Sequence, residues 1–197
     1  MPLVSARHVL VSLLCIVAGA CAGKSHSILI GAAGPLTQSF GDMTKKGVEM
    51  AIAEVNDSGG VRGQRLELDE RDDGADGAKA AAIAQAFVSN PAVVGVVGHV
   101  TSGAMVAAAK VYDAGHLPAI ATSATSPDLT GISPWVFRVV PSDSSNGITI
   151  ARFAAARGKK RAAILYENDA YGRGLAESFR HSFPGEIVST DPISANI

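Results

Sequence analysis

The chain has 197 residues, a formal net charge of −1, 18% charged residues and 5% aromatic residues. This balance is typical of an ordinary soluble α/β protein rich in Ala and Gly, and it excludes a basic face for nucleic acid. The length allows a sizeable core and one or two domains.

The N-terminus has the pattern of a secretory signal. Arg7 and His8 precede the apolar run 9–17, which is too short to span a bilayer as a permanent helix, and small residues follow it. We therefore predict a signal peptide over residues 1–21 and export of the chain. A buried N-terminal helix is disfavoured because no polar face accompanies the apolar one.

Two kinds of cleavage fit the end of this segment. Ala18 and Ala20 suit ordinary signal peptidase, whereas Gly19-Ala20-Cys21 resembles a lipoprotein box in which Ala18 replaces the preferred leucine. Cys15 would leave with the signal, so Cys21 would be the only cysteine of the mature protein and no internal disulfide is expected. We interpret this lone thiol as a lipid-attachment site; the alternative is an incidental cysteine near an ordinary cleavage site.

Strand and helix patterns alternate along the rest of the chain. The strands are short apolar or alternating runs, and the helices have apolar residues at helical spacing between Asn, Gly or Pro breaks. The expected strands are 27–33, 66–71, 93–97, 117–121, 136–140, 162–166 and 186–190, and the expected helices are 41–55, 78–88, 103–114, 148–156 and 172–183. Successive strand–helix units predict a doubly wound parallel sheet, with ligands at the carboxyl ends of its strands.

Hydroxyl side chains follow two of these strands. Ser102 comes after the strand at 93–97 and takes the N-cap position of the next helix. The loop 122–127 follows the strand at 117–121 and opens another helix, with Pro127 in its first turn. Hydroxyls and free backbone N–H groups at helix starts bind small anions. We therefore predict a receptor for an anion such as a carboxylate.

Two longer blocks carry a resemblance to a known family. They are GPLTQSFGDMTKKGVEMAIAEVNDSGGVRGQRLELDERDD, which begins at Gly34, and GHVTSGAMVAAAKVYDAGHLPAIATSATSPDLT, which begins at Gly98. From about Ser27 to its end, the chain resembles the branched-chain amino-acid (leucine/isoleucine/valine) binding proteins of bacterial ABC importers, which have the type I periplasmic-binding fold. The blocks are specific for the superfamily and much less specific for the ligand.

The resemblance implies two lobes. It implies a first ligand-binding lobe over 26–141, a hinge over 142–146 and the start of a second, similar lobe over 147–197. Family members are roughly twice as long, so we expect a fragment or a truncated reading frame. Without the resemblance, the polar segment 141–147 would be interpreted as an ordinary loop between a strand and a helix.

The resemblance also assigns polar ligand-binding residues. Ser102, in GHVTS, would bond a ligand carboxylate through its hydroxyl and amide, and Thr125, in ATSATSP, would contact carboxylate and ammonium. Ser123 and Ala124 would contribute mainly backbone groups. The alternatives are a plain N-cap for Ser102 and turn-stabilising hydroxyls for the loop.

Two aromatic residues complete the expected pocket. Phe40, in GPLTQSFGD, stands where the family often has a tyrosine, so the hydroxyl contact would be lost. Tyr171, in ENDAYGRG, matches the second-lobe motif DxxYG and would close over the ligand. The alternatives are a core aromatic for Phe40 and a helix-start packing residue for Tyr171. The acidic partner of the ligand ammonium is expected in sequence beyond Ile197.

The function implied by the resemblance is that of a solute-binding protein in the periplasm. It would bind a branched-chain or related amino acid between two lobes and deliver it to an ABC permease in the inner membrane, as a monomer and without cofactor or metal. The alternatives within the fold are a ligand-sensing domain of a receptor or regulator and an amide- or urea-binding protein.

An enzyme is disfavoured by the motifs. The segment 99–103 is not a G-x-S-x-G elbow, and 31–35 lacks the G-x-G-x-x-G spacing of a dinucleotide loop. We interpret His99, beside Ser102, as structural, and the acidic run 69–73 as a strand and solvated turn rather than a metal site.

Overall fold

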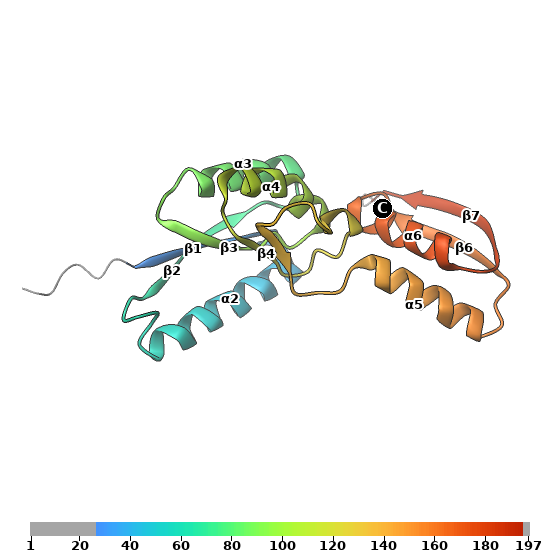
Figure 1. Ribbon diagram of the computed structural model, residues 1–197, viewed down its shortest axis with the longest axis horizontal. Coiled ribbons are helices and arrows are strands. Elements are labelled where there is room, and N and C mark those ends of the chain that lie inside the picture. Colours follow the sequence, from blue (N-terminus) through green and yellow to red (C-terminus); the bar gives the residue numbers. More distant parts are fainter. Residues whose placement is uncertain (1–26, 195–197) are drawn as a thin grey trace, which may run out of the picture.

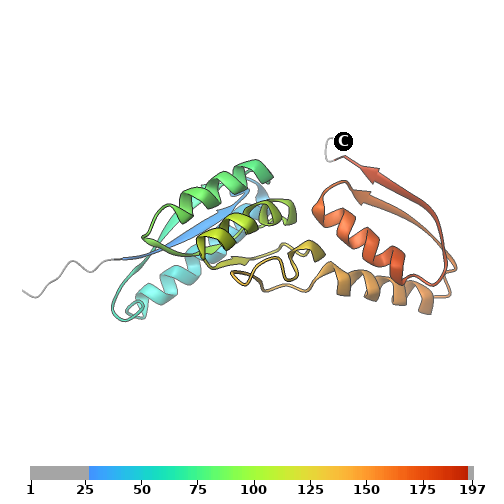
Figure 2. The ribbon, with the colours of Figure 1, turned by 45° about the horizontal axis from the view of Figure 1, so that its top comes forward.

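The chain forms two lobes joined by one crossing. The computed structural model describes residues 27–194, and within them a five-stranded sheet with its helices makes the first lobe, while a two-stranded sheet with two helices makes the second (Figures 1 and 2). The predicted signal peptide and Cys21 lie outside the described residues.

The first lobe alternates strands and helices as predicted. Its elements are β1 (Ile28–Gly34), α2 (Ser39–Asp57), β2 (Leu66–Asp72), α3 (Gly77–Val88), β3 (Val93–Val97), α4 (Ser102–Gly115), β4 (Ala119–Ala121), the 3₁₀ turn η1 (Pro127–Leu129) and β5 (Val136–Arg138). The second lobe follows with α5 (Asp143–Ala156), β6 (Arg161–Glu167), α6 (Ala170–Ser182) and β7 (Glu186–Ile193).

The first sheet is parallel throughout, in the order β2-β1-β3-β4-β5. Helices α3 and α4 cover one face and α2 lies against the other (Figure 1), which is the predicted doubly wound arrangement. Because all strands run the same way, the carboxyl ends of β1, β3 and β4 meet at one edge. The residues that follow those three strands are therefore brought together.

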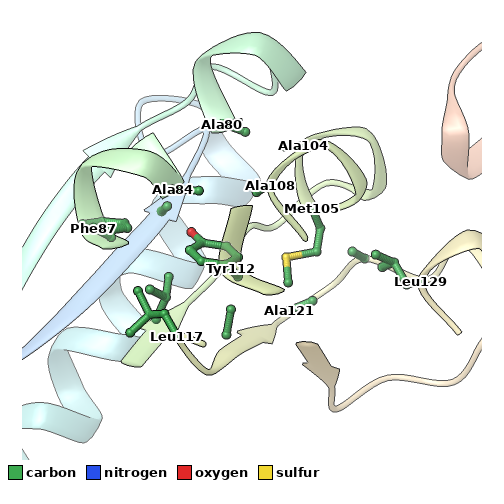
Figure 3. Close-up of a cluster of buried hydrophobic side chains, with 14 of the residues drawn as sticks. Ala80, Ala84, Phe87, Ala104, Met105, Ala108, Tyr112, Leu117, Ala121 and Leu129 are labelled. Carbon is green, nitrogen blue, oxygen red and sulfur yellow. The ribbon is translucent and has the colours of Figure 1, made fainter. Parts of the chain in front are cut away.

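The main core lies beneath α3 and α4. Phe87, Met105 and Tyr112 are completely buried there, together with alanines of both helices (Figure 3). Alanine on the buried faces lets the two helices approach each other and the sheet closely, while the three larger side chains fill the remaining space. The alanine-rich composition is thus a packing device of this lobe.

Several predicted boundaries are wrong in an informative way. Helix α5 begins at Asp143, five residues before the predicted start, because Ser142 caps it by accepting the Ser144 N–H. Strand β5 ends at Arg138 instead of Val140, and the loop after β4 opens only the 3₁₀ turn η1. The predicted hinge at 142–146 overlaps the start of α5, since residues 143–146 form its first helical turn.

The second lobe is thinner. Helices α5 and α6 pack closely, since a Cβ at Gly147 would lie 2.5 Å from the Ser178 Cβ. A hollow of about 380 Å³ lies between α6, β6 and Ile150. In the described part of the chain, no helix is both long enough and apolar enough to cross a membrane.

Candidate functional site

The two predicted hydroxyl loops meet at the carboxyl edge of the first sheet. Ser102 opens α4 directly after β3, and its Oγ accepts the backbone N–H groups of Thr125 and Ser126, each at 3.2 Å. Ser102 is buried, so this contact forms inside the molecule. The structure thus brings Ser102 and the loop 122–127 into direct contact.

The predicted N-cap role of Ser102 is wrong. Thr101 has the extended backbone of the N-cap residue, and Ser102 is the first residue of the helix. Both acceptor positions of the Ser102 hydroxyl are filled by loop N–H groups, so its own hydrogen is left to donate to a further acceptor. This arrangement gives Ser102 an O–H donor at the surface of the site.

Backbone donors accompany this hydroxyl. Within the described residues, the N–H groups of Ser102, Gly103 and Ala104 have no protein acceptor, and the first bond of the helix runs from the Met105 N–H to Thr101 O (3.0 Å). The start of α4 therefore offers several donors and the positive end of the helix dipole. These features suit a carboxylate.

Thr125 offers a hydrogen-bond acceptor to the site, whereas Ser102 offers a donor. Its hydroxyl donates to Asp143 Oδ2 at 2.7 Å, and the Asp143 N–H donates back to Thr125 O at 2.9 Å. Because the hydroxyl hydrogen is used, Thr125 Oγ1 can only accept from a further group. An ammonium is such a donor.

Asp143 is a residue that the sequence analysis missed. It is completely buried at the start of α5, and its other carboxylate oxygen accepts the Asn146 Nδ2 at 3.0 Å. The signal available in the sequence was Ser142-Asp143, an N-cap followed by an acid, which indicates an ordered helix start rather than a loop.

Arg138 is a second missed residue. Its Nη1 donates to the carbonyl oxygens of Ser126 (2.8 Å) and Thr125 (3.3 Å), and its Nη2 donates to Thr130 Oγ1 (2.5 Å). The guanidinium therefore holds the loop from the side of β5, while Asp143 holds it from the side of α5. Both residues act on Thr125 through the segment that crosses between the lobes.

Ser123 and Ala124 differ in exposure. Ser123 is exposed and Ala124 is completely buried. Neither side chain makes a polar contact in the described residues, which leaves their backbone groups as the part available to a ligand.

Phe40 lies in the first turn of α2, after the carboxyl end of β1. Its side chain is 46% exposed, so the alternative of a core aromatic is wrong. It stands at the same edge of the sheet as Ser102, because β1 and β3 are parallel neighbours.

Tyr171 lies in the first turn of α6, where Asp169 caps the helix by accepting the Gly172 N–H at 2.7 Å. It is 43% exposed and borders the second-lobe hollow, which does not include Ser102 or Thr125. The helix itself abuts the first lobe, because a Cβ at Gly174 would lie 2.5 Å from Pro127 Cδ. The lobes therefore touch beside the loop that carries Thr125.

His99 does not contact Ser102. Its ring nitrogens bond to Asp73 and Tyr112, and all three side chains are completely buried. The structural interpretation of His99 is confirmed, since the ring has no free nitrogen with which to activate a serine.

Comparison with known proteins gives a consistent result. A family model described as "Periplasmic binding protein" matches residues 27–196. The leucine-specific-binding protein of Salmonella typhimurium is 34% identical over 183 residues, which are 90% of this chain and 49% of that protein. The chain thus spans about half the length of the curated relatives it matches.

Two solved structures are similar at the level of the fold. An ABC transporter substrate-binding protein from Desulfitobacterium hafniense in complex with Leu has a TM-score of 0.75 and 38% identity, with 86% of this chain and 52% of that chain covered. A solute-binding protein from Rhodopseudomonas palustris BisB5 in complex with 3,4-dihydroxybenzoic acid has a TM-score of 0.75 and 25% identity, covering 86% and 48%.

Proposed function

Because the chain belongs to the periplasmic binding protein family, we propose that it supplies the first lobe and the start of the second lobe of a solute-binding protein of an ABC importer. That protein binds a branched-chain or related amino acid between its lobes and delivers it to the permease in the inner membrane. The names of the leucine-specific relative and of the leucine complex support this ligand class.

The observation that carries the proposal is the contrast between Ser102 and Thr125. Ser102 and the start of α4 present hydrogen-bond donors, whereas Thr125, with its hydrogen given to Asp143, presents an acceptor. A free amino acid has a carboxylate and an ammonium, and both must be satisfied when water is excluded. The two halves of the site match these two groups.

The same contrast disfavours a plain carboxylate ligand, such as the aromatic acid bound by the Rhodopseudomonas palustris relative. A ligand without an ammonium would leave Thr125 Oγ1 without a donor, and it would place its own negative charge near the Asp143 carboxylate. An acceptor left unpaired once closure excludes water costs about 1–3 kcal/mol. We therefore assign the site to an amino acid.

Closure is the proposed binding mechanism. The crossing between β5 and α5, residues 139–142, acts as the hinge, and Tyr171 of α6 and Phe40 of α2 approach the ligand from the two lobes. Contact between α6 and Pro127 supports this geometry because it places the start of α6 beside the ligand loop.

Localisation follows from the N-terminal pattern. We propose a periplasmic protein exported by the signal at residues 1–21, held to the membrane by a lipid on Cys21 and active as a monomer.

The test is a titration of the complete binding protein with two matched ligands, L-leucine and 4-methylpentanoate. The second ligand has the side chain and carboxylate of leucine but lacks the ammonium. Calorimetry should show tighter binding of leucine. Ser102→Ala should weaken the binding of leucine by about 1–3 kcal/mol. Thr125→Val should reduce the difference in binding free energy between leucine and 4-methylpentanoate by a similar amount.

Ser123→Ala is the control, since it removes an exposed hydroxyl from the same loop and should change neither affinity. Equal binding of the two ligands by the complete, unsubstituted protein would contradict the assignment of Thr125 to the ammonium. Unchanged leucine affinity in Ser102→Ala would contradict the carboxylate site.

A further inference from the structure

We propose that His99 is a positioning residue for the ligand-binding start of α4, held in one orientation by Asp73 and Tyr112. The proposal rests on the proposed amino-acid site and adds residues that do not themselves touch the ligand. It arises from a buried polar cluster that the binding chemistry leaves unexplained.

The cluster joins three elements of the first lobe. His99 follows β3, Asp73 follows β2 and Tyr112 lies in α4, and their side chains are all completely buried. His99 Nδ1 lies 2.6 Å from Asp73 Oδ2, and His99 Nε2 lies 3.0 Å from the Tyr112 hydroxyl. Figure 3 shows Tyr112 among the apolar side chains of the core, and the residue is completely buried.

The two ring nitrogens face different partners. With a carboxylate oxygen opposite it, His99 Nδ1 is the donor in our assignment, and Nε2 accepts from the Tyr112 O–H. Burial raises the pKa of the Tyr112 phenol well above its ordinary value, which keeps it a donor. The second Asp73 oxygen accepts the Ala75 N–H at 2.8 Å. Every polar side-chain atom of the cluster is satisfied.

Backbone contacts fix the same segment on either side of the ring. The Gly98 N–H donates to Ile120 O at 2.9 Å, and the His99 N–H donates to Met105 Sδ at 3.2 Å. A Cβ at Gly98 would lie 2.1 Å from Ala33 O, so this strand end is pressed against β1. The path from His99 to Ser102 is only three residues long and has little freedom.

The consequence concerns the Ser102 hydroxyl. Tyr112 lies ten residues beyond Ser102 in the same helix, so the bond from Tyr112 to His99 fixes α4 relative to the end of β3. A buried hydrogen-bonded network gives orientation more than net stability. We assign the cluster the task of holding Ser102 Oγ within reach of the Thr125 and Ser126 N–H groups.

The experiment compares Tyr112→Phe with Phe87→Leu. Both residues are completely buried in the same core, but only the first substitution removes a hydrogen bond to His99. In Tyr112→Phe, the loss of one buried hydrogen bond should make the Thr125 and Ser126 N–H groups exchange with solvent deuterium about tenfold faster. It should also lower the affinity for L-leucine about tenfold. Phe87→Leu should change neither the exchange rates nor the affinity, although it should lower the melting temperature at least as much as Tyr112→Phe does.

Two outcomes separate this proposal from the proposed function. If the complete binding protein, of which this chain supplies the first lobe and the start of the second, does not bind leucine, the proposed function fails, and the exchange rates of Thr125 and Ser126 still decide the positioning role. If Tyr112→Phe leaves those rates and the leucine affinity unchanged, or alters them no more than Phe87→Leu, the positioning role of His99 is overturned. A ring ¹⁵N spectrum without a hydrogen on Nδ1 would overturn it as well.

Discussion

The two lobes differ in how they bury apolar surface. In the first lobe, α3 and α4 enclose Phe87, Met105 and Tyr112 against the sheet, whereas the buried apolar side chains of the described second lobe are Ala151, Ala176 and Phe183. Burial of apolar area is the main source of folding free energy. Within the described residues, apolar burial is therefore concentrated in the lobe that carries Ser102 and Thr125.

Exposure in the second lobe has a simple geometric cause. With only two strands described there, β6 and α5 are each covered on part of their surface, and Leu165 and Phe153 are 68% and 61% exposed. Ser102 and Thr125 are therefore held by a well-packed lobe, whereas Tyr171 belongs to a lobe whose described part has a small core.

The largest effect should come from two phenylalanines that are both buried, one in each lobe. Phe87→Ala should lower the free energy of unfolding of the first lobe by about 3–5 kcal/mol, because it empties a packed core. Phe183→Ala should melt the second lobe alone. Trp135, the only tryptophan, lies in the first lobe, so its fluorescence reports on that lobe while far-UV circular dichroism reports on both.

If Trp135 fluorescence and far-UV circular dichroism of Phe183→Ala change in the same transition, the expected difference in stability between the two lobes is wrong. A shared transition would mean that the lobes unfold as one cooperative unit and that the thin second lobe draws stability from the first.

An intermediate effect is expected at the contact between the lobes. Gly174→Ala places a methyl group against the Pro127 ring and should cost about 1–3 kcal/mol through overpacking, seen as a lower melting temperature of the second lobe. Gly47→Ala in α2 is the matched control, because nothing lies within 4 Å of the added carbon. It should stabilise the chain by about 0.5–1 kcal/mol. Stabilisation by both substitutions would show that α6 is free of the first lobe in solution.

The smallest effect concerns loops within the first lobe. The Thr37 hydroxyl and N–H both donate to Asp72 Oδ2, and the hydroxyl bond is the largest of the causes that lower the pKa of Asp72. A depressed carboxyl pKa stabilises the fold above the unfolded value, about 3.9, and this contribution is lost as pH falls through the folded value.

Thr37→Val should therefore destabilise the chain by less than about 1 kcal/mol at neutral pH, with the difference shrinking below about pH 4. Urea titrations at pH 7 and pH 3 measure it. A difference that stays the same on acidification would show that the hydroxyl acts through packing and not through Asp72.

Much of the first lobe was accessible from the sequence. Apolar strands separated by periodic helices predicted the parallel sheet, and the hydroxyls after β3 and β4 predicted an anion receptor. The structure brings Ser102 and the loop of Thr125 together because parallel strands end at one edge. These features depend on local pattern and on the direction of the strands. Both can be read along the chain.

What was missed depends on contacts between distant residues. Ser102 resembles an N-cap by position, but two loop N–H groups from 23 and 24 residues away occupy its hydroxyl, and Thr101 takes the cap position. The roles of Asp143 and Arg138 were not predicted, because their partners lie on the loop after β4. Neither spacing nor composition contains that information.

Strand β6 has a practical consequence for handling the protein. In the described residues it pairs only with β7, so its other edge carries unpaired backbone groups beside the exposed Leu165. Such an edge is a template on which a further polypeptide can add as a strand. Preparations of residues 27–194 alone should thus self-associate in a concentration-dependent way, and Leu165→Lys should improve their solubility.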